Sequence, residues 1–210
     1  MKQSSWISGL LLKDLLNLRP MTKTLVFMFL IFGIIFIPMG NAMTVYFLLM
    51  IFAALLPMTS LTMDDMAKWD RYALTMPVTR KDIVTSKYLM TIIFFCAAIV
   101  ISGIIAGVSY YLTPETATPF WFIVLVGSLG LFYGALLFPL LYKFGSEKAR
   151  YMMFVLMAVI GVLLVGWFAL FGDALTGNLL IYILITAVVS VAAFITSYFV
   201  SVRFYEKKEF

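Results

Sequence analysis

Hydrophobic residues fill most of the chain in long runs that are separated by short polar intervals. Each run is about 20 residues long, which is the length that an α-helix needs to cross a hydrocarbon core of about 30 Å. No charged residue lies in the middle of a run, so the runs show no sign of an ion or proton path. The pattern predicts an all-α, polytopic membrane protein with six transmembrane helices. These helices are expected near residues 22–39, 43–63, 86–112, 119–142, 150–172 and 177–202.

Residues 1–20 precede the first of these runs and follow a different pattern. Residues 4–18 predict a helix that lies in the headgroup layer, because they are too few and too polar to cross the bilayer. We expect Pro20 to end this helix, since proline lacks a backbone N–H and clashes with the preceding turn. An alternative is a signal peptide that is cleaved near residues 40–42. The polar side of the predicted helix consists of Ser5, Gly9, Lys13 and Asn17.

The composition agrees with a membrane protein and narrows the classes of function. Charged residues make up 12% of the chain, against about 25% in soluble domains. The length of 210 residues leaves no room for a separate soluble domain beside the spans, so residues 1–210 are expected to form one transmembrane domain. The chain has no histidine and one cysteine, which excludes metal sites built from His and Cys and a disulfide within the chain.

The basic residues indicate the orientation of the predicted spans. All 15 Lys and Arg residues fall on alternate connections, whereas residues 39–42, 113–119 and 172–177 contain none. Because cytoplasmic loops of membrane proteins carry the excess of Lys and Arg, both termini are predicted to be cytoplasmic. This asymmetry explains the net charge of +5, so we expect no nucleic-acid partner.

The longest charged interval, residues 69–89, lies between the second and third predicted spans. Residues 64–74 predict a short helix that ends before Pro77, because the residue before a proline avoids helical geometry. Thr79 and Asp82 have the spacing of a capping box, so a new helix is expected to begin there. The interval therefore predicts a helix-turn-helix elbow that continues directly into the third span.

Few residues of the chain suit catalysis. The sequence contains neither a phosphate-binding loop nor a dinucleotide-binding loop, and a nucleophilic triad would lack its histidine base. We therefore predict no catalytic residue, cofactor site or metal site on this chain. Two interpretations of Asp64, Asp65 and Asp70 stay open. All three could bind Mg²⁺ together with a lipid phosphate. Alternatively, Asp64 and Asp65 could begin a short helix, where the positive end of the helix dipole stabilises acidic side chains.

Two glycine pairs lie inside predicted spans, Gly103 with Gly107 and Gly130 with Gly134. Glycines four residues apart share one face of a helix and let a neighbouring helix approach closely. Packing within the chain and packing between subunits both fit this spacing.

Residues 74–88 read LTMPVTRKDIVTSKY, and this segment resembles the first cytoplasmic loop of ATP-binding-cassette (ABC) permeases of the type 2 exporter class. The six spans and the N-terminal helix extend the resemblance over nearly the whole chain. The chain is similar to small bacterial permeases that export peptide toxins such as phenol-soluble modulins. It also resembles permeases that confer resistance to bacitracin and lantibiotics.

The resemblance implies a permease in the bacterial cell membrane that pairs with a second, identical or related permease. A separate ABC ATPase would bind the ATP and Mg²⁺ and would dock on the elbow, with residues 142–150 as a second contact. The implied ATPase-coupling residues are Asp64, Asp65, Trp69, Asp70, Arg71, Tyr72, Pro77, Arg80 and Lys81. The second contact would consist of Lys143, Glu147, Lys148 and Arg150.

The lack of charge within the predicted spans bears on the substrate. An apolar path offers no partner for a buried charge, which favours export of an amphipathic peptide or a hydrophobic antibiotic. Two alternatives stay open, namely an intramembrane lipid-modifying enzyme that uses Asp64, Asp65 and Asp70, and a membrane scaffold that gives immunity to a toxin.

Overall fold

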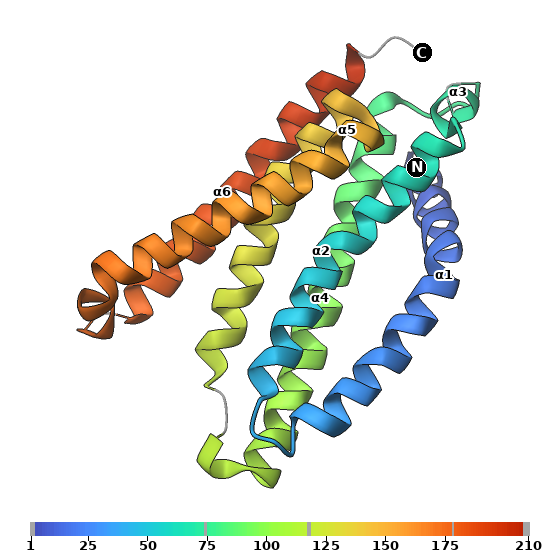
Figure 1. Ribbon diagram of the computed structural model, residues 1–210. Helices are drawn as coiled ribbons and strands as arrows, with labels where there is room; N and C mark the ends of the chain where they lie inside the picture. The colour runs from blue at the N-terminus through green and yellow to red at the C-terminus, as the bar shows by residue number, and fades with distance from the viewer. Residues whose placement is uncertain (1–2, 74, 117–118, 178, 208–210) are drawn as a thin grey trace.

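The computed structural model describes residues 3–73, 75–116, 119–177 and 179–207. This part of the chain consists of helices and short connections and contains no strand. Figure 1 shows long helices that lie together at the end with both termini and fan out towards the opposite end. The helices are α1 (Gln3–Phe36), α2 (Ala42–Met66), α3 (Trp69–Ala73), α4 (Arg80–Leu112), the 3₁₀-helix η1 (Pro114–Thr116), α5 (Phe120–Gly177) and α6 (Leu179–Glu206).

Five stretches of the described chain are long and apolar enough to cross a membrane. They overlap the predicted first, second, third, fourth and sixth spans, although the first begins at Trp6 and not near residue 22. The predicted span at residues 150–172 lies in the second part of α5, where the side chains of residues 163–177 fall outside the described ones. The six-span layout therefore stays a prediction. The five stretches are Trp6–Phe36, Ala42–Met66, Arg80–Leu112, Phe120–Gly145 and Leu179–Glu206.

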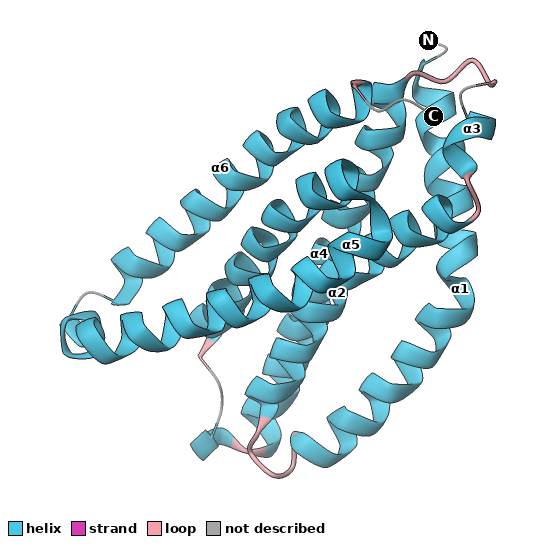
Figure 2. Ribbon diagram, turned by 45° about the horizontal axis from the view of Figure 1, so that its top comes forward, coloured by secondary structure: helices cyan, strands magenta, loops and turns pink. Residues whose placement is uncertain are grey.

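Helix α1 runs without interruption through Pro20, so the predicted end of a helix at this residue is wrong. A proline inside a helix removes one backbone hydrogen bond and bends the helix, but the helix continues when its surroundings compensate. The Thr22 hydroxyl donates to the Leu18 carbonyl at 2.9 Å, and the Thr24 hydroxyl donates to the Pro20 carbonyl at 3.3 Å. Both views show α1 changing direction partway along its length (Figures 1 and 2).

The predicted connection at residues 142–150 is much shorter in the structure. Helix α5 has one non-helical residue, Gly145, with φ 77° and ψ 170°, and helical geometry resumes directly after it. A positive φ of this size favours glycine, which has no Cβ. The chain reverses at this residue, and Figure 1 shows the second part of α5, in orange, returning beside α6, in red.

The segment between α2 and α4 contains the short helix α3, but its boundaries differ from the prediction. Asp64 and Asp65 belong to the last turn of α2 and do not begin a new helix, so the expected interaction with the positive end of a helix dipole is wrong. Lys68 has a φ of 52° at the turn that separates α2 from α3. Helix α4 begins with the expected reciprocal bonds, because Asp82 N donates to Thr79 Oγ1 at 3.2 Å and Thr79 N donates to Asp82 Oδ2 at 3.0 Å.

Helix α2 lies centrally and contacts α1, α4 and α5, whereas α6 packs on α5 and α4. We call the end of the bundle that carries both termini and α3 the termini end, and the end with the α1–α2 connection and η1 the far end (Figure 1). A buried apolar cluster lies towards each end. The termini-end cluster includes Val84, Tyr88, Phe138, Phe194 and Tyr205, and the far-end cluster includes Ala42, Tyr46, Met50, Phe95 and Ile123.

Candidate functional site

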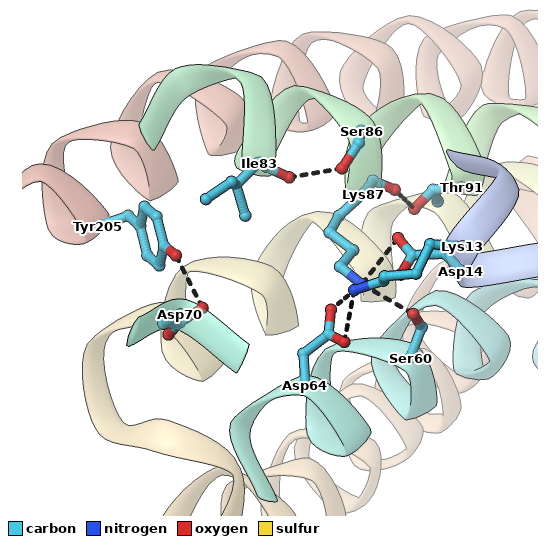
Figure 3. Close-up of polar contacts among 10 residues, drawn as sticks. All are labelled: Lys13, Asp14, Ser60, Asp64, Asp70, Ile83, Ser86, Lys87, Thr91 and Tyr205. Carbon is cyan, nitrogen blue, oxygen red and sulfur yellow. Dashed lines mark hydrogen bonds and ion pairs between the residues drawn. The ribbon is translucent and has the colours of Figure 1, made fainter. Parts of the chain in front are cut away.

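Four charged side chains from three helices meet inside the termini end of the bundle (Figure 3). Helix α1 supplies Lys13 and Asp14, α2 supplies Asp64, and α4 supplies Lys87. Asp14 and Lys87 are each 1% exposed and Asp64 is 6% exposed, so three of the four are almost fully removed from solvent. We call these four residues the four-charge cluster.

The cluster is held by alternating positive and negative groups. Lys87 Nζ lies 2.8 Å from Asp14 Oδ2 and 2.5 Å from Asp64 Oδ2. Lys13 Nζ lies 2.7 Å from Asp64 Oδ1 and 3.2 Å from Asp14 Oδ1. Each lysine therefore contacts both carboxylates, and the formal charges of the four side chains sum to zero.

Lys87 is at the centre of this arrangement. Its ammonium group also donates to Ser60 Oγ on α2 at 2.8 Å. An ammonium group has three N–H donors, so the two carboxylates and this hydroxyl satisfy all of them. Breaking a buried ion pair by removing one partner leaves an uncompensated charge, which is far more costly than the pair itself is favourable. The cluster therefore fixes how α1, α2 and α4 sit against one another.

The four-charge cluster was not predicted from the sequence. Lys13 was expected on the polar side of a headgroup helix, whereas it reaches into the bundle, and no role was predicted for Asp14. A signal was available, because Asp14 lies midway between Leu10 and Leu18, and residues four apart share one face of a helix. All three are buried, with exposed fractions of 9%, 1% and 0% for Leu10, Asp14 and Leu18. A carboxylate in such a stripe requires a cation from another helix.

Two residues of α3 face the bundle and fasten this helix to it. Lys13 Nζ lies 4.3 Å from the ring centroid of Trp69, a distance at which the cation is attracted to the face of the ring. The Tyr205 hydroxyl of α6 donates to Asp70 Oδ1 at 2.8 Å. Helix α3 is thus joined to α1 on one side and to α6 on the other.

The neighbouring residues of α3 point outward. Arg71 is exposed, and 64% of the Tyr72 side chain is accessible. Pro77 and Lys81 are exposed as well. Of the predicted coupling residues, Arg71, Tyr72, Pro77 and Lys81 therefore form an outer set, whereas Asp64, Trp69 and Asp70 have contacts within the protein.

Arg80, at the first turn of α4, joins α4 to the end of α6. Its Nη1 atom donates to the backbone carbonyls of Tyr205 at 3.0 Å and Glu206 at 2.7 Å. The last carbonyls of a helix lack partners within the helix and carry the negative end of its dipole, so a guanidinium group there satisfies both needs. The contact explains why α6 ends against the start of α4.

Asp64, Asp65 and Asp70 line one small cavity together with Lys87, Tyr142 and Tyr205. Its volume of about 20 Å³ is enough for one water molecule. Both lysines of the cluster already pair with Asp64. Within the described part of the chain, no group of three or more His, Cys, Asp and Glu residues is suited to hold a metal ion.

The predicted second contact lies around the Gly145 turn. Lys143, Glu147 and Lys148 are exposed, and the side chain of Arg150 lies outside the described ones. Lys143 Nζ also lies 5.4 Å from the ring centroid of Phe204 on α6. A Cβ atom at Gly145 would lie 3.5 Å from Asp65 Oδ2, so the end of α2 and this turn are neighbours.

The helices, the spans and the polar contacts at one end define a polytopic helical membrane protein. The chain belongs to the ABC-2 transporter family, because the family described as "ABC-2 family transporter protein" matches residues 9–206. It is therefore a membrane component of an ABC transporter, a class in which an ABC ATPase is the general partner. No curated protein and no solved structure matches the chain.

Proposed function

We propose that this protein is the permease of an ATP-driven exporter and that a separate ATPase docks on the outer set of α3 and its flanking turns. The observation that carries the proposal is the position of α3. In a chain of the ABC-2 family, it lies between two candidate spans and presents Arg71 and Tyr72 outward while Trp69 and Asp70 hold it to the bundle. The one-sided distribution of Lys and Arg supports a cytoplasmic location for this end, where ATP is available.

The contacts of α3 suggest how force would enter the permease. ATP and Mg²⁺ bind to the ATPase, whose closure displaces α3. The cation–π contact between Lys13 and Trp69 transmits the displacement to α1, and the hydrogen bond between Tyr205 and Asp70 transmits it to α6. A movement of packed elements past one another is a common way in which a domain closure is passed to a second site. Two permeases, identical or related, are expected to move together.

The four-charge cluster supports the proposed class of substrate. Its two lysines and two aspartates pair with one another, so the cluster offers no uncompensated charge to a substrate. The termini-end cluster and the far-end cluster, which are separate from the four-charge cluster, consist of hydrophobic residues. An amphipathic peptide or a hydrophobic antibiotic would cross such an interior at a lower desolvation cost than an ion or a sugar.

The proposal is tested by purifying the permease together with its ATPase. We expect Arg71→Glu and Tyr72→Ala each to weaken the complex by at least about tenfold, because exposed arginine and aromatic side chains dominate many interfaces. The variant Arg203→Glu is a matched control, since Arg203 is an exposed residue of α6 with the same charge. ATP-dependent export in membrane vesicles should fall in parallel with binding.

Full ATPase binding and full export by both α3 variants would show that the docking site is elsewhere. Lipid modification by the purified permease without any ATPase would instead favour the enzyme hypothesis. Retention of a toxin without ATP-dependent export would favour the immunity scaffold.

A further inference from the structure

Two basic residues of α1 have no anionic partner among the described residues, unlike the charges of the four-charge cluster. Arg19 and Lys23 lie one turn apart within the candidate span Trp6–Phe36, and both side chains are exposed. Neither makes an ion pair with any described residue of the chain. The nearby carboxylate of Asp14 is already paired with Lys13 and Lys87. Cations within a span are costly unless they find an anionic partner or reach the headgroup layer.

These cations line a cleft between α1 and α4. The cleft has a volume of about 360 Å³ and is bordered by Leu15, Arg19, Thr22, Lys23, Val26 and Phe94. Because the Thr22 hydroxyl donates to the Leu18 carbonyl, the donors available to a ligand are those of Arg19 and Lys23. The described residues that line the cleft include no acidic side chain, so its charge is positive.

The cleft has a polar part and an apolar part at different depths. Arg19 and Lys23 precede Val26 on α1 and therefore lie nearer the termini end, where α1 begins. Val26 lies about one turn deeper on α1, and Phe94 provides an aromatic wall from α4. The side chains of Leu15 and Val26 are 38% and 54% exposed, so the cleft opens on the outer surface of the bundle.

We propose that this cleft binds an anionic phospholipid, with its phosphate between Arg19 and Lys23 and an acyl chain along Val26 and Phe94. Charge complementarity favours this occupant, because a phosphate group accepts hydrogen bonds from both guanidinium and ammonium groups. Basic clefts between membrane helices are known to select anionic headgroups. The bound lipid would supply the partner that the described protein residues do not.

The test uses the purified full-length chain without ATPase, so that its result does not depend on the proposed exporter function. Native mass spectrometry measures the retention of phosphatidylglycerol, with phosphatidylcholine and water-soluble glycerol phosphate as comparisons. We expect the double variant Arg19→Gln/Lys23→Gln to bind phosphatidylglycerol about thirty-fold more weakly than the wild type. The matched control Arg203→Gln/Lys207→Gln, which removes two exposed cations of the termini end, should bind like the wild type.

A second variant tests the apolar part of the cleft. Val26→Trp fills it and leaves both cations in place, so it should weaken phosphatidylglycerol binding without changing the weak binding of glycerol phosphate. Unfolding midpoints in detergent check that each variant is folded.

Three results would overturn the proposal. They are retention of phosphatidylglycerol by the double variant at the wild-type level, binding of phosphatidylcholine as tight as that of phosphatidylglycerol, and binding of glycerol phosphate alone as tight as that of the lipid. A change of oligomeric state in the double variant, with unchanged lipid retention, would show that a second copy of the chain occupies the cleft instead.

Discussion

The two ends of the bundle are held together by different kinds of contact. At the termini end, the four-charge cluster joins three helices, and Asp70 and Arg80 bind α6. The far-end cluster instead consists of apolar side chains, many of them small, such as Ala42, Ala53 and Ala54. Ion pairs and hydrogen bonds depend on distance and direction, whereas apolar packing has no preferred direction. The contacts at the termini end therefore specify one arrangement of the helices, whereas those at the far end only require that the apolar surfaces of the helices fit together.

This difference agrees with the proposed function. A force applied at α3 needs a rigid attachment if it is to move α1, α4 and α6 together. Helices that open a path for a substrate must change their packing, which is easier where no buried ion pair has to be broken. The difference between the two ends can be tested by weakening each end in turn.

The largest effect is expected when the four-charge cluster loses its central lysine. Lys87→Met keeps the length of the side chain but leaves Asp14 and Asp64 with Lys13 as their only cation in the cluster. Removing one partner from a buried pair costs about 3–5 kcal/mol, so the free energy of unfolding should fall by that amount. Unfolding titrations with SDS in mixed micelles would measure the loss.

Lys81→Met is the matched control for this variant, because Lys81 is an exposed lysine of the same helix. It should change the free energy of unfolding by no more than about 0.5 kcal/mol. The double variant Lys87→Met/Asp14→Leu restores charge balance and should recover most of the loss. Equal stability of Lys87→Met and Lys81→Met would contradict the buried position of Lys87.

A smaller effect is expected when α3 is released from α6. Tyr205→Phe removes the hydroxyl that donates to Asp70 Oδ1 and keeps the ring that packs 5.4 Å from Tyr142. The loss of one hydrogen bond to a carboxylate should cost about 1.5–3 kcal/mol. Because the outer surface of α3 is unchanged, ATPase binding should persist while export per ATP hydrolysed decreases.

The control for this variant is Tyr151→Phe, since 77% of the Tyr151 side chain is exposed. Its stability and its export should match those of the wild type. If Tyr205→Phe also retains full stability and full export, then the contact between α3 and α6 does not carry force.

The features predicted correctly from the sequence are those that depend on residues close together along the chain. The capping box at Thr79 needs only a partner three residues away, and the spans follow from runs of apolar residues. The four-charge cluster could not be predicted in the same way, because Lys13 and Asp64 are 51 positions apart and meet only when helices pack. Local rules also misjudged Pro20, since they describe the residue's own preference and not the packing around α1.

The smallest effect is expected at the far-end cluster and concerns the glycine pair of α5. A Cβ atom at Gly130 would lie 3.3 Å from the Phe95 ring and 3.4 Å from the Met50 carbonyl, whereas a Cβ atom at Gly134 would have no neighbour within 4 Å. Alanine is favoured over glycine inside a helix by about 1 kcal/mol, so Gly134→Ala should stabilise the protein by up to that amount. In Gly130→Ala the tight contacts should offset this gain and leave the variant no more stable than the wild type. Equal stabilisation by both changes in SDS titrations would show that α5 is not closely packed on α2 and α4 at Gly130.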